Sequence, residues 1–510
     1  IVLHIVLVSQ SARIKRCVFL QHLHNEEENF KMEKLRPKLF STMKGYTKEQ
    51  FVKDVISGII VAIIALPLSI ALALASGVTP EQGIYTAIIA GFLISLFGGS
   101  RVQIAGPTAA FATIVAGIVA ENGMSGLIIA TILAGIILII MGLCRLGNLI
   151  KFIPFTITTG FTAGIAVTIV IGQLKDFFGI TYKKGLPTVE TMDKLKALFK
   201  SFDSFNYQAL IVGLVCLAVL IIWPYINKTI PGSLIAVIVG IAMVSGLKMN
   251  VNTIGDLYTI SNKLPSFSVP AFNLDTIGKL LPDAFTIAIL AAIESLLSCV
   301  VADSMVHSKH NSNMELIAQG IGNIGSGLFG GIPATGAIAR TAANIKNGGR
   351  TPIAGMVHAV VLLLILVVLM PYAAFIPMPA IAAILFMVAY NMCGWRTFKK
   401  LVETSPKSDI AVLVITFALT VIFDLVVAIE IGMILACILF MKRMSDVTNV
   451  EGWSYIDEND DPDCITLKQV PKNTLVYEIS GPMFFGAADK LLSIPLHSST
   501  NCLILRMRSM

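Results

Sequence analysis

The sequence predicts an all-α polytopic membrane protein with about fourteen transmembrane segments in a 7+7 inverted repeat, followed by the start of an α/β domain. Three observations predict this class. Hydrophobic residues make up 55% of the 510 residues and charged residues only 14%. The mean hydropathy is +0.81, a value typical of a multi-spanning protein rather than a soluble one. Two of the apolar runs are broken by Gly and Pro at corresponding places in the two halves.

The charge and cysteine content exclude several classes of protein. The net charge of +7 is interpreted as loop charge that orients the chain in a bilayer, so no nucleic-acid partner is predicted. The eight cysteines are scattered without CxxC spacing, which is typical of unpaired thiols used as small hydrophobes. We predict no metal, no cofactor and no enzymatic activity.

Residues 1–46 are predicted to form a cytoplasmic N-terminal segment. Ile1 is not an initiator, and the first eight residues are too short for a secretory signal. Met32, which precedes Glu-Lys-Leu-Arg-Pro-Lys, is the more plausible natural start. Residues 1–31 are therefore interpreted as upstream sequence without a function.

The transmembrane domain is predicted at 47–443, with repeat one at 53–247 and repeat two at 282–443. Apolar runs of about 17 to 25 residues are long enough to cross a bilayer. Two segments, 107–120 and 336–347, are too short for a hydrocarbon core of about 30 Å, and each is third in its half. The candidate segments lie at roughly 53–75, 82–99, 107–120, 126–145, 152–175, 207–227, 231–247, 282–302, 314–330, 336–347, 352–370, 375–392, 409–423 and 425–441.

The positions of Lys and Arg support this tally, because short cytoplasmic loops collect basic residues. With the N-terminus inside, the short outside turns contain no Lys or Arg, and the exception is the longer loop 176–206. The pattern predicts a multi-pass protein of the plasma (inner) membrane with both termini in the cytoplasm. The inside turns carry Arg101, Arg145, Lys151, Lys228, Lys309, Lys346, Arg350, Arg396, Lys399, Lys400, Lys442 and Arg443.

The two short segments predict an anion site. Seven segments in each half is an odd number, so the halves are inverted and the short helices enter from opposite faces. Pro107 suits a first helical turn and Gly336 suits the matching start. Two helix N-termini would then face each other, each with free N–H groups and about half a positive charge. Arg340, one turn into the second short helix, adds a full charge, which favours an anion.

Small residues around the two breaks let a ligand approach the backbone closely. The alternative is that both breaks are mere kinks between packed helices, which are common in membrane proteins. Two matched breaks together with an Arg favour the binding site. The small residues are Ala105, Ala109, Ala110, Ala334, Ala337 and Ala339.

Glu294 lies within the first segment of the second half, where a carboxylate should face a cavity or a partner. Ser298 is four residues on and shares its helical face. Because burial favours a protonated carboxyl, Glu294 is predicted to take up and release a proton during transport. The alternatives are a structural hydrogen-bond acceptor or a counter-ion of Arg340. Asp303, His307 and His310 are interpreted as solvated residues at the cytoplasmic end.

The character of the chain changes after Arg443. Residues 444–473 are polar and charged and are interpreted as a linker. Residues 474–480 and 501–506 read as strands, and Gly481 begins a predicted helix between them. These elements predict the opening of an α/β domain at 474–510, which we expect to be truncated because so few residues cannot close a sheet.

Six runs carry a resemblance to a known family: LPLSIALALASGVTPEQGIYTAIIAG (66–91), GGSRVQIAGPTAAF (98–111), GFTAGIAVTIVIGQLKDFFG (160–179), AAIESLLSCVVADSM (291–305), ELIAQGIGNIGSGLFGGIPATGAIARTAANI (315–345) and FDLVVAIEIGMILACILFM (423–441). They are similar to the bacterial sulfate permease (SulP) family, which includes the animal anion exchangers and prestin. The resemblance implies a UraA/SulP-like fold of seven-plus-seven inverted repeats, divided into core and gate domains. It also implies a cytoplasmic STAS domain, of which 476–491 would be the start.

The resemblance implies roles for individual residues. Glu294 resembles the family's coupling position, with Ser298 beside it; some bicarbonate transporters hold sodium with an Asp there, whereas a Glu favours protons. Leu68 stands where many members have Gln, which leaves the site less polar. The anion is expected against Leu68, Leu72, Thr108, Ala109, Ala337, Ala339 and Arg340.

We therefore expect a secondary active transporter of small oxyanions, working by proton-coupled symport with an elevator-like or rocking movement of the core domain. Sulfate is the first choice, and C4-dicarboxylates such as succinate or bicarbonate come next. The expected partners are a small anion, a coupling proton rather than sodium, the lipid bilayer and a second copy in a homodimer. From other classes, an anion channel or motor, a nucleobase permease and a membrane-anchored scaffold are the alternatives.

Overall fold

The computed structural model describes residues 35–147, 154–183, 186, 191–227, 231–270, 274–422, 425–447, 449–453, 474–480 and 502–509. The chain divides into two compact units. One unit is helical and comprises Lys34–Gly432, and the other comprises Met433–Met510 with Ile1–Glu33. The predicted upstream sequence, 1–31, lies outside the described residues.

The first half of the helical unit begins with the short α2 (Lys38–Thr42) and continues with long apolar helices. Local capping explains several of their starts. The Thr47 side chain accepts a hydrogen bond from the Gln50 N–H at the start of α3, and Asn206 caps α8 in the same way. The long helices are α3 (Lys48–Ala75), α4 (Pro80–Phe97), α5 (Ala112–Leu143), α6 (Phe155–Phe177), α8 (Tyr207–Ile226) and α9 (Gly232–Gly246).

Gly123 breaks α5 within its span. Its φ of 67° is left-handed, a conformation that suits glycine. The break lies between the predicted segments 107–120 and 126–145, so the boundary predicted there is confirmed as an interruption of the helix.

The second half also consists mainly of long helices, but its third helix, α13, is short, whereas α5, which follows α3 and α4 in the first half, is long. Near the end of this half a further short helix, α16, stands between α15 and α17. The helices are α11 (Leu274–Val306), α12 (Ser312–Leu328), α13 (Ile338–Lys346), α14 (Ile353–Leu369), α15 (Met378–Cys393), α16 (Trp395–Thr404), α17 (Lys407–Ile422) and α18 (Leu425–Val447).

Short elements connect these helices. The predicted outside loop 176–206 contains a helix, α7 (Thr191–Lys200), which was not predicted. The other connecting elements are η3 (Phe202–Ser204), α10 (Ile254–Leu257) and η4 (Met370–Phe375).

Eight helices among the described residues are long and apolar enough to cross a membrane. The all-helical membrane fold is therefore confirmed for this unit, while the count of fourteen segments stays a prediction.

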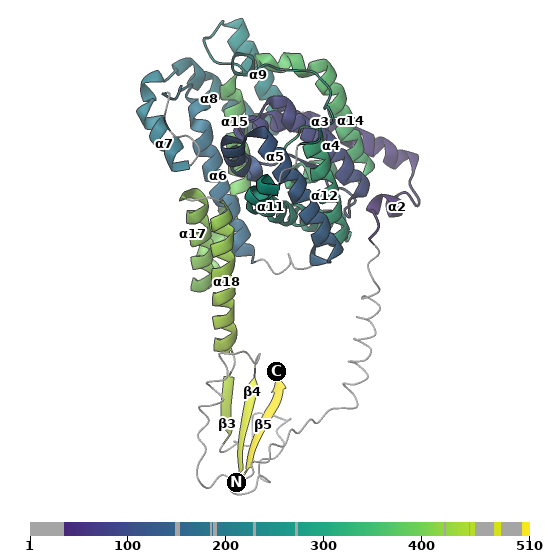
Figure 1. Ribbon diagram of the computed structural model, residues 1–510, viewed down its shortest axis with the longest axis vertical. Coiled ribbons are helices and arrows are strands. Elements are labelled where there is room, and N and C mark those ends of the chain that lie inside the picture. Colours follow the sequence, from purple (N-terminus) through teal and green to yellow (C-terminus); the bar gives the residue numbers. More distant parts are fainter. Residues whose placement is uncertain are drawn as a thin grey trace. The chain divides into compact units, whose positions relative to one another are not determined.

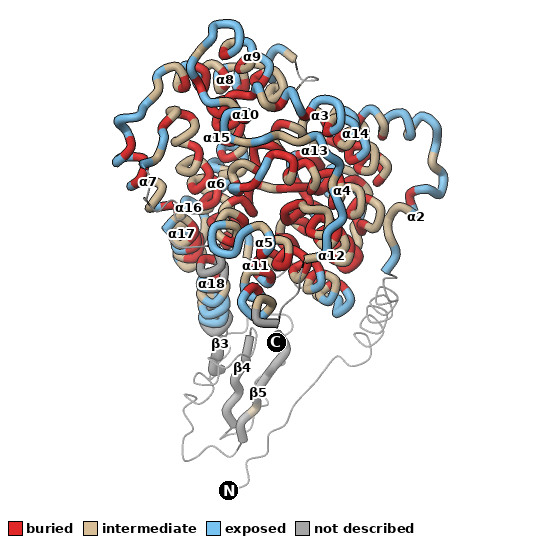
Figure 2. The backbone as a smooth tube through the Cα atoms, turned by 45° about the horizontal axis from the view of Figure 1, so that its top comes forward, coloured by how far each residue is buried: buried red, intermediate tan, exposed pale blue. Residues whose placement is uncertain are grey.

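The helices of this unit fall into two groups by their contacts (Figure 1). Buried residues gather in the interior of the unit and exposed residues on its rim (Figure 2). A division of this kind is what the expected core and gate architecture calls for. In one group α5 packs on α11 and α12, and α4 and α14 pack on each other and on α3; in the other group α6 packs on α15 and α17, and α8 packs on α9 and α15.

The two halves meet in a minimal sheet. The strands β1 (Ala105–Gly106) and β2 (Thr335–Gly336) pair antiparallel, with Ala105 opposite Gly336 and Gly106 opposite Thr335. The expectation that the two broken segments lie together is confirmed by this pairing.

The helix starts differ from those predicted. Pro107 is not in a first helical turn, because the 3₁₀-helix η1 (Ala109–Phe111) precedes α5. Gly336 lies in β2, and α13 begins only at Ile338. Gly336 lies opposite Ala105 in the sheet and donates its N–H to Ser295 Oγ, so it does not open a helix. Pro107 also favours an extended conformation in Gly106 before it.

The C-terminal unit contains three strands in the order β3-β4-β5 among its described residues. β4 (Thr474–Ser480) pairs antiparallel with β3 (Asn449–Trp453) and parallel with β5 (Cys502–Ser509). Two of these strands lie where strands were predicted, whereas β3 falls inside the predicted linker. The predicted helix from Gly481 lies outside the described residues, and the STAS assignment stays a prediction.

Candidate anion-binding site

Helix α11 is hydrogen-bonded to the strand β2. The Gly336 N–H donates to Ser295 Oγ at 3.1 Å, and the hydroxyls of Ser295 and Thr335 are 2.6 Å apart. Thr335 Oγ1 also donates to the Ala291 carbonyl at 3.1 Å. These buried bonds hold β2 in a fixed position on α11.

A second set of bonds ties the start of α13 to β1. The Ala337 N–H donates to the Ile104 carbonyl at 2.9 Å. The Ile104 N–H in turn donates to Thr341 Oγ1 at 3.0 Å. The short helix of the second half is therefore anchored to the first half at both its entry and its first turn.

Two helix N-termini open beside the sheet. Neither η1 nor α13 has a side-chain cap among the described residues. The first backbone N–H groups of a helix have no carbonyl one turn earlier to which they can donate a hydrogen bond. These groups also lie at the positive end of the helix dipole. Ile338 and Ala339, at the start of α13, are exposed, so a ligand can reach this end.

Arg340 is the third residue of α13 and is only 1% exposed. Its Nη2 donates to the Pro107 carbonyl at 3.1 Å and to Ser69 Oγ at 3.4 Å. Its Nε and Nη1 have no hydrogen-bond partner among the residues that the structure describes. Because both acceptors are neutral, the buried positive charge is not compensated by the bonds it makes, which is costly without an anion.

Glu294 is half-buried on α11 and accepts a hydrogen bond from Thr108 Oγ1 at 2.9 Å. Within the described part of the chain it forms no ion pair with Arg340. The counter-ion alternative therefore has no support in the geometry, whereas the hydrogen-bond acceptor alternative fits the bond to Thr108.

The other predicted site residues are distributed as follows. Leu72 is buried on α3 and Leu68 is half-buried, and both belong to or pack against the apolar cluster that contains Ala109. Ala337 is buried at the start of α13. Ser298 is buried and donates to Thr341 Oγ1 at 3.5 Å, so its observed bond supports the α13 anchor rather than Glu294.

A family model described as the sulfate permease family matches residues 51–416. The chain belongs to the sulfate permease family. The family and the relatives below are transporters of anions, not enzymes.

Among curated relatives, a candidate sulfate transporter of Bacillus subtilis (strain 168), YvdB, is 42% identical over 456 residues, which cover 88% of this chain and 83% of YvdB. The bicarbonate transporter BicA of a Picosynechococcus species is 33% identical over 453 residues, covering 85% of this chain and 79% of BicA.

Two solved structures resemble the fold. The transmembrane domain of a cyanobacterial bicarbonate transporter BicA has a TM-score of 0.67 at 31% identity, covering 77% of this chain and 98% of that domain. The structure of SLC26A9 has a TM-score of 0.80 at 19% identity and covers 98% of this chain and 86% of that protein. The second likeness concerns the fold alone.

The sequence of this sulfate permease family member did not lead us to predict Ser69 as a site residue, although Arg340 donates a hydrogen bond to its hydroxyl. It follows Leu68 directly in the apolar run of α3. A hydroxyl residue within such a run was the available signal, because polar side chains in membrane helices tend to find partners.

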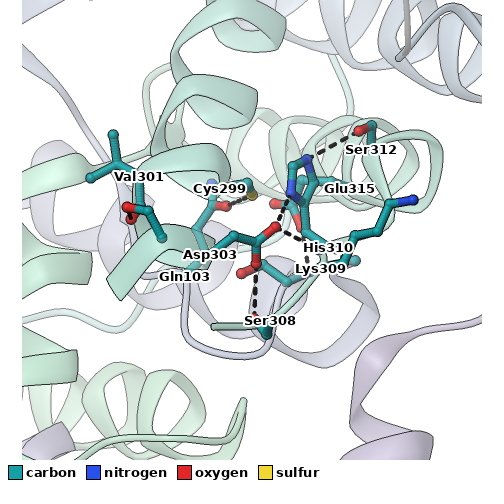
Figure 3. A network of polar contacts seen from close by, with 12 residues as sticks. Gln103, Cys299, Val301, Asp303, Ser308, Lys309, His310, Ser312 and Glu315 are labelled. Carbon is teal, nitrogen blue, oxygen red and sulfur yellow. Dashed lines mark hydrogen bonds and ion pairs between the residues drawn. The ribbon is translucent and has the colours of Figure 1, made fainter. Parts of the chain in front are cut away.

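Asp303 and His310 are half-buried and paired with each other, so solvation alone does not account for them; Figure 3 shows their contacts. His310 Nδ1 lies 2.7 Å from Asp303 Oδ2, and their side chains are 7% and 17% exposed. Ser312 Oγ lies 3.0 Å from His310 Nε2. His307 is exposed, so solvation does apply there. The described residues contain no group of three His, Cys, Asp or Glu that could hold a metal.

The same region joins the two halves. Glu315, buried at the start of α12, accepts the N–H groups of Gly99 and Ser100 at 2.8 and 3.0 Å. Next to it, the Cys299 thiol donates to Gln103 Oε1 (Figure 3). These residues connect the end of α4 with α11 and α12 and serve the packing of the halves.

Proposed function

We propose that the chain is a secondary active transporter of small oxyanions, with sulfate as the first choice, and that it works by proton-coupled symport in the plasma membrane with both termini in the cytoplasm. The observation that carries the proposal is the buried Arg340 guanidinium, whose Nε and Nη1 have no partner among the described residues.

The anion would sit against the start of α13 and η1. The free N–H groups of Ala109 and Ala339 would donate to its oxygens, and Arg340 would supply the compensating charge. Leu68, Leu72 and Ala337 would bound this place with apolar groups that exclude water and strengthen the electrostatic attraction.

The coupling proton would bind Glu294. An ionised Glu294 repels an anion held nearby, whereas a protonated one does not, so each ligand favours the binding of the other. Thr108 supports this role because its hydroxyl can donate to an ionised carboxylate and accept from a protonated one. Ser298 keeps α13 aligned with α11 through Thr341. Sodium is the less favoured coupling ion.

Bicarbonate is the second candidate substrate, because two relatives at 33% and 34% identity carry the name of bicarbonate transporters. C4-dicarboxylates come next. An anion channel or motor on the same scaffold is the alternative from another class. We also propose a homodimer, which light scattering of the purified protein would test.

Counterflow in proteoliposomes with labelled sulfate, bicarbonate and succinate, repeated across pH, tests the proposal. Concentrative uptake that collapses when the proton gradient is dissipated supports symport, and passive conductance supports a channel. Arg340→Ala should abolish uptake. Lys346→Ala, at the exposed end of the same helix, should not. Undiminished uptake by folded Arg340→Ala would refute the site.

A further inference from the structure

Helix α16 (Trp395–Thr404) has no buried residue along its length. It begins directly after α15, at Gly394 with a left-handed φ of 55°. Only Ser405 and Pro406 separate it from α17. Since α15 is apolar and α17 packs along the apolar α6, we expect α16, which has no buried residue, at the membrane surface where its two neighbours end.

The two faces of α16 differ in chemistry. Trp395, Phe398 and Val402 recur at three- and four-residue spacing and form one apolar face. Trp395 is 62% exposed, and the Trp395 and Phe398 rings stack at a centroid distance of 6.3 Å. Phe398 contacts Phe417 of α17 edge-on at 5.6 Å. Helix α16 also packs on α6, and Phe398 is half-buried, whereas Trp395 and Val402 stay exposed among the described residues.

The opposite face is basic. Arg396, Lys399 and Lys400 are all exposed, and the one carboxylate among them, Glu403, lies 3.7 Å from Lys399. Both side chains of that pair are more than half exposed, at 64% and 60%, so the pair is screened by water and leaves an excess of positive charge.

We propose that α16 binds anionic phospholipid, with Trp395 and its apolar neighbours among the acyl chains and the three basic side chains on the headgroup phosphates. A short amphipathic helix with an aromatic anchor and a basic polar face has the chemistry of an interfacial lipid-binding helix. A bound anionic lipid covers the apolar face with its acyl chains and neutralises the basic face with its headgroup phosphate. A second copy of the chain would present the same positive charge to α16. An acidic segment of the chain, such as Asp457–Asp461, would leave the apolar face uncovered.

Each basic side chain near an anionic surface strengthens association roughly fivefold. A several-fold preference of the α16 environment for anionic over zwitterionic lipid is therefore expected. High salt should reduce it, because at 1 M the screening length is about 3 Å.

The test uses the full chain carrying Trp223→Phe and Trp453→Phe, so that Trp395 is the single remaining tryptophan. It is reconstituted in nanodiscs of mixed phosphatidylglycerol and phosphatidylcholine, with one or the other lipid brominated near the top of an acyl chain. At equal mole fraction, brominated phosphatidylglycerol should quench Trp395 several-fold more than brominated phosphatidylcholine. Addition of 1 M salt should bring the two values together.

The triple variant Arg396→Gln, Lys399→Gln, Lys400→Gln should lose the preference while quenching by both lipids remains. The matched control, Lys183→Gln, Lys196→Gln, Lys200→Gln, removes the same charge from other exposed positions and should keep it. Equal quenching by the two lipids around unmodified α16 would overturn the charge recognition. If neither brominated lipid quenches Trp395, the proposal is overturned altogether, because another part of a protein chain would then cover the helix.

Discussion

Gly106→Ala should displace the Arg340 guanidinium. A Cβ at Gly106 would lie 2.4 Å from Arg340 Nη1, and its next neighbours, in Ala87, are at an ordinary 3.6 Å. Since non-bonded carbon atoms rest about 3.5–4.0 Å apart, the guanidinium must retreat by roughly 1 Å. Its bonds to Pro107 and Ser69, now 3.1 and 3.4 Å, would then lengthen beyond hydrogen-bond range.

Both the anion affinity and the stability should fall. Loss of one hydrogen bond from a charged donor to an anion costs about 1.5–3 kcal/mol, which corresponds to a roughly 10- to 150-fold weaker Kd. The folded state loses two bonds from the buried guanidinium to neutral acceptors, each worth about 1.5–3 kcal/mol. Replacement of a glycine by alanine recovers only about 0.4–1 kcal/mol through the unfolded chain. The melting temperature should therefore fall as well.

The assay is equilibrium binding of labelled sulfate to the purified protein, with bicarbonate and succinate as parallel ligands, beside a thermal melt. Gly117→Ala is the matched control, because a Cβ at Gly117, also in the first half, would meet nothing within 4 Å. The control should bind like the unmodified protein. Wild-type affinity in folded Gly106→Ala would refute the placement of the anion at the guanidinium.

Three further changes have distinct expected outcomes. Gly336→Ala places a Cβ 1.5 Å from Gln103 Nε2, inside a buried region, so the melting temperature should fall sharply. Adding Gln103→Ala should restore part of the lost stability. If the stability losses of the two single variants simply add in the double variant, the clash is contradicted. Glu294→Gln should leave anion binding in place but make uptake insensitive to an imposed pH gradient; continued proton-driven concentration of anion would rule out Glu294 as the proton carrier. Asp54 is 0% exposed, and its carboxylate accepts hydrogen bonds from Tyr46, Gln50, Arg350 and Thr351. Asp54→Asn should therefore lower the free energy of unfolding by about 2–4 kcal/mol, measured as a lower melting temperature. An unchanged melting temperature would mean that these bonds contribute little.

Local patterns were sufficient to predict most of the helices. The segment predicted at 207–227 is α8, Tyr207–Ile226, because a run of apolar residues and a capping Asn are both visible in the sequence. The placement of Pro107 in a helical turn was wrong because its conformation depends on β2, more than 200 residues away. No local rule reports that the second half supplies a pairing strand.

The candidate site was predictable in composition but not in its contacts. Arg340 stood out as a charge in apolar sequence, and the prediction of facing helix starts followed from the Gly and Pro breaks. Its contact with Ser69, and the bond of Ser298 to Thr341 rather than to Glu294, depend on how helices distant in the chain are packed. The pairing of Asp303 with His310 could not be predicted either, because only the folded turn after α11 brings these two residues together and shields them from most of the solvent.

The pairing of β1 with β2 has a consequence for biosynthesis. Arg340 follows Pro107 by 233 residues, and at roughly 5–20 residues per second a ribosome needs about 10–50 s to produce the intervening chain. Throughout that interval the newly made β1 has no strand partner, in surroundings where water is scarce. The β1 backbone of the first half can therefore pair only after residues 335–336 have been synthesised.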